Sequence, residues 1–201
     1  MRRVAVIGAL ASVLSCAHLG DRISYYEMAP RLAYQGFSFE KPPDSHWYIM
    51  RSEEHYTDVT LRRETASATH TFYASVALAA LDVQPKSHKE FAKLVHSKGQ
   101  TAPYAVTEFS HSETPTLLQN QWCVRFDTLA AVRGAPQAPD SELHMTVRGF
   151  RCLHPAFPKA SIDFFYSERG LPSELDPGLT QEGEQFLRGV RIDVAPDTPA
   201  A

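Results

Sequence analysis

The fold is decided by residues 122–153, which read WCVRFDTLAAVRGAPQAPDSELHMTVRGFRCL. At both ends of this stretch apolar and polar residues alternate, which predicts the strands Trp122–Leu129 and Leu143–Leu153. Residues 133–140 between them contain one glycine and two prolines, which predicts a loop. The stretch therefore predicts an antiparallel hairpin.

One register of this hairpin matches several pairs of residues at once, because facing residues of an antiparallel pair have position numbers with a constant sum. It centres the turn between Gln137 and Ala138, in the middle of the predicted loop. It also brings together two cysteines, two opposite charges, and an aromatic ring with a glycine: Cys123 with Cys152, Asp127 with Arg148, and Phe126 with Gly149. We therefore predict a Cys123–Cys152 disulfide, which would stabilise the fold by roughly 3–4 kcal/mol.

Cys152 has a competing interpretation as a reactive thiol. His154 lies two residues further along the chain, and residues two apart on a strand point to the same face. The disulfide is favoured because the N-terminal sequence predicts export to an oxidising compartment, where an even number of cysteines pairs.

The first sixteen residues have the pattern of a secretory signal. Arg2–Arg3 precede the apolar run Val4–Leu14, and Ser15 and Cys16 follow it. The run is too short to span a bilayer, which needs about 20 apolar residues. We expect residues 1–15 to be a cleaved signal peptide.

The end of this signal resembles the lipobox of bacterial lipoproteins. The resemblance implies that Cys16 becomes the mature N-terminus and carries lipid, whose acyl chains anchor a protein stably to a membrane. Ala17 stands where an aspartate favours inner-membrane retention in enterobacterial lipoproteins, so the implied location is the cell envelope, at the periplasmic face of the outer membrane. An ordinary secretory signal and a cytosolic protein with an apolar first strand are the alternatives.

Composition restricts the class of protein. The chain has 201 residues, 43% hydrophobic and 21% charged, which is typical of a soluble globular protein. Its net charge of -3 offers no basic patch, so we expect no nucleic-acid partner. The length after the signal suffices for one domain with a sizeable core.

The rest of the chain predicts several strands, a helix, more strands and a second helix. The predicted strands are Gly36–Phe39, Trp47–Met50, Val59–Arg62, Thr71–Leu81, Tyr104–Ser110, Thr116–Leu129, Ser161–Ser167 and Val190–Val194. Ser87–Lys98, with a capping box at Ser87 and Glu90, and Thr180–Arg188 are the predicted helices. The end of the fourth strand, Ala77–Leu81, also fits a helix. Period-two alternation places two sets of apolar side chains on single faces: Phe72, Ala74, Val76 and Leu78, and Ile162, Phe164 and Tyr166.

This order predicts an α+β fold with a mainly antiparallel sheet and two packed helices, since strand–helix units do not alternate. We expect a lipidated N-terminus and tether over residues 16–35, a single globular domain over 36–194 and a flexible tail over 195–201.

Two resemblances follow from these elements. The opening Gly36–Phe39, the helix after the fourth strand and the late helix resemble the PsbP-like α/β/α sandwich. The stretches His70–Phe72, Gly149–Pro155 and Tyr166–Gly170, together with Cys123, are similar to a group of uncharacterised bacterial lipoproteins and secreted proteins. The second resemblance implies export and the same cysteine pair, and no established activity.

The nine histidines do not form a metal-binding pattern, and neither a nucleophile elbow nor a phosphate loop is present. We therefore expect no cofactor and no metal. His70, His154 and Arg169 lie near predicted strand ends and are the candidates for a surface site. The alternative is that His70 and Arg169 hydrogen-bond backbone carbonyls at the sheet edge.

The sequence favours a non-enzymatic binding or scaffold module. We expect its partners to be the membrane, through Cys16, and an envelope protein or a small apolar ligand. The alternative is an envelope hydrolase that uses His70 or His154.

Overall fold

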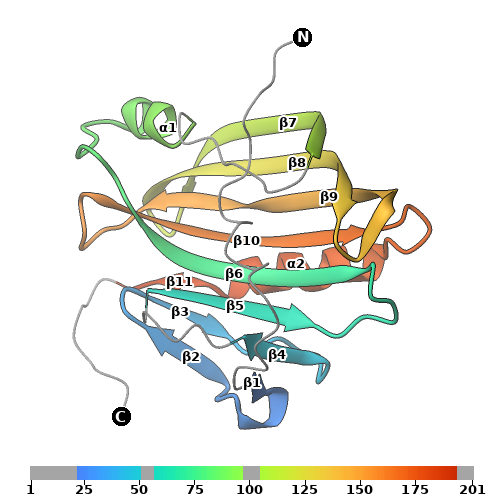
Figure 1. Cartoon of the computed structure of the whole chain (residues 1–201). Helices are drawn as coiled ribbons and strands as arrows, with labels where there is room; N and C mark the ends of the chain where they lie inside the picture. Colours follow the sequence, from blue (N-terminus) through green and yellow to red (C-terminus); the bar gives the residue numbers. More distant parts are fainter. Residues whose placement is uncertain (1–21, 51–56, 97–104, 194–201) are drawn as a thin grey trace.

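The structure is a computed structural model that describes residues 22–50, 57–96 and 105–193 (Figure 1). In chain order its elements are β1 (Arg22–Ser24), the 3-10 helix η2 (Tyr25–Glu27), β2 (Arg31–Tyr34), β3 (Phe37–Glu40), β4 (Trp47–Met50), β5 (Asp58–Arg63), β6 (Thr71–Ala80), α1 (His88–His96), β7 (Ala105–Leu118), β8 (Gln121–Ala135), β9 (Ala138–Leu153), β10 (Ala160–Gly170), α2 (Pro177–Gly189) and β11 (Arg191–Ile192).

The strands form two antiparallel sheets. The larger sheet has eight strands in the order β1-β4-β5-β6-β10-β9-β8-β7, and the smaller has the order β11-β3-β2. Helix α1 packs on one face of the large sheet, here called the α1 face, and α2 packs on the opposite one, the α2 face (Figure 1). The predicted class, α+β with a mainly antiparallel sheet and two packed helices, is confirmed.

The main core lies on the α2 face. The two sets of apolar residues predicted to share faces of β6 and β10 contribute to it, and most of them are fully buried. Phe37 and Phe39 of the small sheet and Phe186 of α2 cover them. Each buried side chain of this size contributes about 1.5–3 kcal/mol, so this core holds the small sheet and α2 on the large sheet.

The hairpin of β8 and β9 has the predicted register, with all three predicted pairs in place. The predicted loop over residues 133–140 is wrong. Both strands continue into it, and Ala135 pairs with Ala138 across the turn. The register shifts between Arg133 and Ala135, where Gly134, whose φ is +74°, faces residues 139–141 of β9, and this shift closes the shorter turn.

The prediction of one strand over Thr116–Leu129 is also wrong. The chain turns back at Gln119 and Asn120, which have φ values of 50° and 63°, and these join β7 to β8 as a tight hairpin. The Gln119 side-chain amide donates to the Val190 carbonyl at 2.8 Å, and the Ile192 amide donates to Gln119 Oε1 at 3.1 Å. This turn therefore holds the segment that leads into the small sheet.

The domain begins earlier than predicted. β1 pairs with β4, β2 pairs with β3, and Met28 between them is buried, so residues from Arg22 onward belong to the fold and not to a tether. The predicted signal peptide (1–15), Cys16 with the remaining tether residues and the predicted tail (195–201) lie outside the described residues.

Both predicted helices are present with shifted starts, and residues 97–98 of the first predicted helix lie outside the described residues. At α1 the Glu90 amide donates to Ser87 Oγ as predicted, but the Glu90 carboxylate accepts from the Lys86 amide, one residue before the expected one. α2 starts at Pro177, before the predicted Thr180, because Asp176 caps it by accepting from the Gly178 amide. Ala77–Ala80 continue β6, so the helical alternative there is wrong.

Candidate binding face

The α1 face carries polar side chains as well as apolar ones. Between β6 and β7 it has two distinct regions, one charged and one rich in hydroxyl groups. They lie on either side of an apolar cluster formed by Phe126, Ala130, Val132, Leu143, Met145, Val147 and Phe165 with Tyr73 and others. No described helix covers the middle of this face, since α1 packs only near its β7–β8 end (Figure 1), yet the residues of the apolar cluster are 0–7% exposed.

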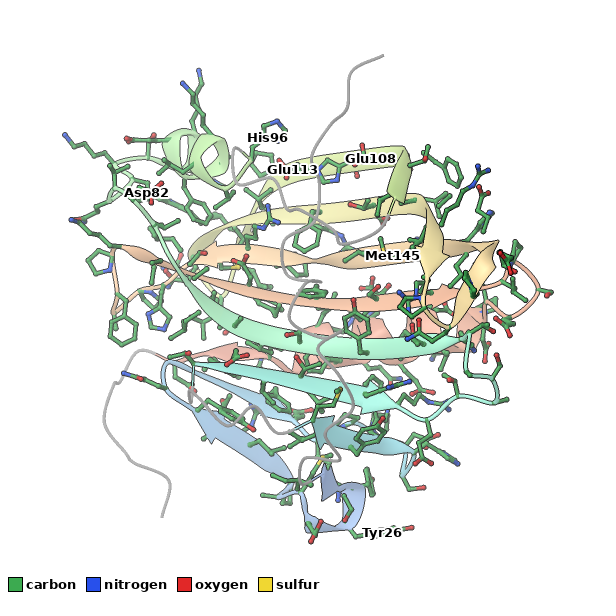
Figure 2. The ribbon with its side chains drawn as sticks, viewed as in Figure 1. Tyr26, Asp82, His96, Glu108, Glu113 and Met145 are labelled. Carbon is green, nitrogen blue, oxygen red and sulfur yellow. A yellow bond between two sulfur atoms is a disulfide. The ribbon has the colours of Figure 1, made fainter. Side chains whose placement is uncertain are left out.

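Glu113 of β7 is the centre of the charged region (Figure 2). Its Oε2 lies 2.6 Å from His96 Nδ1, and its Oε1 lies 3.2 Å from His111 Nε2. Arg151 of β9 lies 3.8 Å from the same Oε1 and donates to the Val95 carbonyl at 3.0 Å. These contacts join the end of α1 to the sheet. This region cannot be recognised in the sequence, because its residues come from three separate elements.

The second region, here called the hydroxyl corner, consists of Thr71, Ser167 and Arg169. Arg169 pairs with Thr71, and Ser167 pairs with Tyr73, so these side chains share the α1 face. The corner is buried: Thr71 is 8% exposed, Ser167 0% and Arg169 6%. The hydroxyls of Thr71 and Ser167 have no hydrogen-bond partner among the described residues.

Arg169 places a cation beside these hydroxyls. Its Nη2 donates to Gln137 Oε1 at 3.5 Å, so the turn between β8 and β9 reaches the corner. On the other side, Val147 and Met145 of β9 pair with Ser167 and Arg169 and begin the apolar cluster. The corner thus combines hydrogen-bond donors, a positive charge and an adjoining cluster of buried apolar side chains.

His70 lies just before β6 and is 8% exposed. Its Nε2 is 2.9 Å from Glu168 Oε1, which also accepts from the Asp176 amide at 2.7 Å. The prediction that His70 hydrogen-bonds a backbone carbonyl is wrong, because its partner is the buried carboxylate of Glu168. The contact connects the loop before β6 to the N-terminus of α2.

His154 is a structural residue at the opposite end of the sheet. Its Nδ1 accepts from the amides of Ala156 and Phe157, so its Nε2 carries the proton and donates to the Gly36 carbonyl at 2.9 Å. A Cβ at Gly36, where φ is +83°, would lie 2.5 Å from this nitrogen. Both ring nitrogens are therefore occupied by backbone groups.

The predicted surface site of His70, His154 and Arg169 is wrong in two respects. All three side chains are buried. The ten-residue β6, roughly 30 Å long, separates His70 and Arg169 at one end from His154 at the other. His70 and Arg169 share an end of the sheet but project from opposite faces.

On the α2 face, Tyr166 lies against α2. A Cβ at Gly183 would come within 2.4 Å of its ring, so only glycine allows the helix this close. Burial raises the pKa of Tyr166 to about 12, so its hydroxyl stays protonated and donates to Glu184 Oε1 at 3.2 Å. The contact positions α2. The Tyr166 hydroxyl does not ionise near neutral pH.

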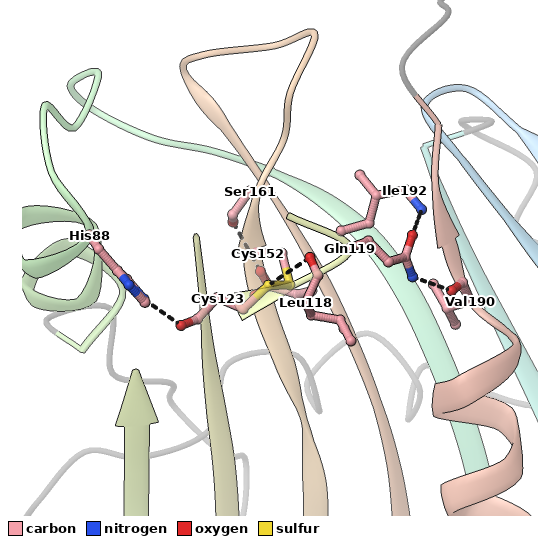
Figure 3. Close-up of a disulfide and its surroundings, with 9 residues drawn as sticks. His88, Leu118, Gln119, Cys123, Cys152, Ser161, Val190 and Ile192 are labelled. Carbon is pink, nitrogen blue, oxygen red and sulfur yellow. Dashed lines mark hydrogen bonds between the residues drawn. A yellow bond between two sulfur atoms is a disulfide. The ribbon is translucent and has the colours of Figure 1, made fainter. Parts of the chain in front are cut away.

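The structure joins Cys123 to Cys152 with an S–S distance of 2.11 Å, at the end of the β8–β9 hairpin (Figure 3). Both cysteines are fully buried. His88 of α1 lies 2.8 Å from the Cys123 carbonyl and stacks on Trp122. The interpretation of Cys152 as a free reactive thiol does not fit this arrangement.

Within residues 22–50, 57–96 and 105–193, no group of three or more His, Cys, Asp or Glu side chains is arranged to hold a metal ion. In the same part of the chain, no helix is both long and apolar enough to cross a membrane.

Glu174, between β10 and α2, gives a pH-dependent prediction. Its carboxylate accepts from Ser67 Oγ at 2.6 Å, from Thr69 Oγ1 at 2.7 Å and from the Leu171 amide at 2.8 Å. These hydrogen bonds, those of Ser67 and Thr69 first, lower the pKa of Glu174. A lowered folded-state pKa stabilises the protein above the unfolded-state pKa of about 4.3, and the contribution is lost as pH falls through the folded-state pKa.

We expect Glu174→Gln to lower the free energy of unfolding by about 1 kcal/mol at pH 7. The difference from wild type should shrink below about pH 4, where the wild-type carboxyl is protonated. Urea denaturation at pH 7 and pH 3 measures both values. Asp140→Asn, at an exposed carboxylate of β9, is the control. A difference that is equal at both pH values would contradict the prediction.

Comparisons with known proteins identify only distant structural likenesses. No protein-family model matches the chain, and no curated protein matches it. Among solved structures, a point mutant of the protein Mog1 is similar with a TM-score of 0.39 and 13% identity, covering 78% of this chain and 90% of that one. The Saccharomyces cerevisiae Ran-binding protein Mog1p is similar with a TM-score of 0.38 and 13% identity, covering 86% and 94%. Likenesses at this level carry no argument about function.

Proposed function

We propose that this chain is a lipoprotein of the bacterial cell envelope, anchored through Cys16, whose domain binds a ligand on the α1 face without catalysing a reaction. The anchor is supported by the order of segments at the start of the sequence, where basic residues are followed by an apolar run, a small residue and then a cysteine. The outer membrane is the favoured location, with the domain on its periplasmic side.

The hydroxyl corner is the observation that carries the binding role. Buried hydroxyls without partners cost stability, at about 1–3 kcal/mol each, so proteins seldom leave them without a use. Here they lie on the long antiparallel strands β6 and β10, which hold them rigidly beside an apolar cluster. Such a combination of a few placed polar groups and an apolar wall is typical of small-molecule sites.

The two candidate catalytic histidines favour binding over hydrolysis. A hydrolase needs a base within hydrogen-bond reach of a nucleophile. Both nitrogens of His154 are bound to backbone groups. His70 pairs with Glu168 on the α2 face, away from the hydroxyl corner.

The early start of the domain supports a position near the membrane if Cys16 carries lipid. From Cys16 to Arg22 the chain can span at most roughly 20 Å. A lipid on Cys16 would therefore hold the domain beside the bilayer surface, within reach of molecules that leave it.

We further propose that the fold is a PsbP-like sandwich. The support is that α1 and α2 pack on opposite faces of one antiparallel sheet (Figure 1).

Cys16→Ala tests the anchor. In a detergent phase-separation assay we expect wild type in the detergent phase and Cys16→Ala in the aqueous phase, because the acyl chains supply the membrane affinity. Ala17→Ser, which keeps the cysteine, is the matched control. The same samples are assayed on ester, amide and phosphomonoester substrates, and no turnover is expected. Wild type in the aqueous phase, or turnover lost in a folded His70→Ala variant, would contradict the proposal.

A further inference from the structure

We propose that the end of the domain around Tyr26 contacts the surface of a phospholipid bilayer and that this contact orients the domain. The contact surface, here called the tyrosine tip, consists of Tyr25, Tyr26 and Lys41. This inference rests on the proposed anchor at Cys16 and goes beyond it, because an anchor limits the distance of the domain from the membrane but does not set its orientation.

Tyr26 is exposed to an unusual degree. Among the exposed large hydrophobic residues of the described ranges it has the largest exposed fraction, 83%. Figure 2 shows Tyr26 projecting from the end of the molecule opposite His96 and Glu108. Tyrosine is enriched at membrane–water interfaces, because its ring is apolar and its hydroxyl is polar. A single exposed ring is ordinary on a protein surface, so the surroundings of Tyr26 decide the matter.

The tyrosine tip is held in place by several contacts. Tyr25 and Tyr26 pack edge to face with ring centroids 5.6 Å apart, and the Tyr25 hydroxyl donates to the Pro43 carbonyl at 3.4 Å. The Glu27 carboxylate accepts from the amide and the hydroxyl of Ser24, at 2.8 Å and 2.7 Å. These bonds close η2, so Tyr26 projects from an ordered turn.

Lys41 adds a positive charge to the tip. Its Nζ lies 3.7 Å from the centroid of the Tyr25 ring. An ammonium group beside an aromatic surface suits the membrane interface, where the rings lie at the level of the head groups and the cation meets anionic lipid.

The place of the tip in the chain indicates that its partner is the bilayer. Tyr26 lies just after β1, and the chain between Cys16 and Arg22 spans at most roughly 20 Å. A lipid on Cys16 therefore brings this end of the domain within reach of the head groups. The other exposed large hydrophobic residues of the described chain all come later in the sequence: Val83, Phe109, Leu117 and Leu129.

The experiment uses the full lipidated chain, isolated from membranes and reconstituted into vesicles of phosphatidylethanolamine and phosphatidylglycerol. Tyr26→Trp reports on the tip, and Phe109→Trp, at a 51% exposed position of β7, is the matched control. Wild-type emission is subtracted to remove the signal of the two native tryptophans. The emission added by Tyr26→Trp should shift to shorter wavelength, and phospholipids brominated near the head-group end of their acyl chains should quench it. The emission added by Phe109→Trp should stay unchanged.

Two further variants are combined with Tyr26→Trp. Lys41→Gln should lower the equilibrium constant for contact, obtained from the quenched fraction, about fivefold on these vesicles and not at all on phosphatidylcholine vesicles. Cys16→Ala should abolish the quenching, because stable attachment needs the acyl chains. An equal effect of Lys41→Gln on both kinds of vesicle would overturn the role of Lys41.

Three other results would contradict the inference. Equal quenching of Tyr26→Trp and Phe109→Trp, or no quenching of either in protein that floats with the vesicles, would overturn it while the anchor stands. A shift to shorter wavelength without quenching would show that a protein surface covers Tyr26, and would also overturn it. Failure of the lipidated protein to float with the vesicles would refute the anchor, and the inference with it.

Discussion

Removing the Cys123–Cys152 disulfide is expected to lower the free energy of unfolding by about 2–5 kcal/mol. The bond joins residues 29 positions apart and lies in the main core, where both cysteines are fully buried. Without it the unfolded chain gains conformational freedom, and the open end of the β8–β9 hairpin loses its covalent closure. A loss of this size is a large part of the total stability of an ordinary domain, about 5–15 kcal/mol.

The measurement is urea denaturation of the double variant Cys123→Ala/Cys152→Ala against wild type, each with and without reductant. Reductant should destabilise wild type and leave the double variant unchanged. Mass spectrometry of non-reduced peptides should find the two cysteines linked in protein isolated from an oxidising compartment. Two alkylatable thiols in that sample, or equal denaturation midpoints, would refute the prediction.

Gly149→Ala is expected to destabilise the protein by roughly 3 kcal/mol, at the upper end of the range for overpacking. Gly149 lies in the middle of β9 between Phe126 of β8 and Phe165 of β10, whose rings pack 6.5 Å apart. An added Cβ would lie 2.3 Å from the Phe164 carbonyl oxygen and 2.5 Å from Phe165 Cβ. Backbone cannot move aside as a flexible side chain can, so the strands must separate.

Gly134→Ala provides the comparison for this variant. Gly134 has a positive φ of +74°, but an added Cβ there would meet nothing within 4 Å. Gly134→Ala should lower the free energy of unfolding only by the cost of backbone strain, about 1 kcal/mol. Thermal unfolding of both variants separates the two causes. A Gly149→Ala variant no less stable than Gly134→Ala would show that the sheet accommodates the methyl group and that the prediction is wrong.

The parts of the fold that were predictable from the sequence rest on local rules. The register of β8 and β9 follows from three residue pairs and a constant sum, and the inward faces of β6 and β10 follow from period-two alternation. The turn at Gln119 and Asn120 was missed because the pair lacks the glycine that usually marks such a turn. β1 has three residues, too few to show any periodicity.

The candidate site was less accessible to sequence reasoning, because it depends on which strands become neighbours. Arg169 was selected for its position at the end of a strand, while its neighbours Thr71 and Ser167 looked like ordinary strand residues. They become notable only when β6 and β10 pair and bury both hydroxyls. His154 was misjudged because its backbone partners, Gly36 and the amides after it, come together only in the folded chain.

The small sheet has a consequence for the order of assembly. Its middle strand, β3, lies near the start of the domain, and β11 pairs with it from Arg191 and Ile192. The β8–β9 hairpin can form from its own turn as soon as both strands exist, whereas this sheet is incomplete until Arg191 and Ile192 have been made. Until then Phe37 and Phe39 lack part of their cover, and contacts so distant in sequence form slowly. In the interval before β11 arrives, these exposed apolar side chains favour aggregation, and a chaperone that binds them would limit it.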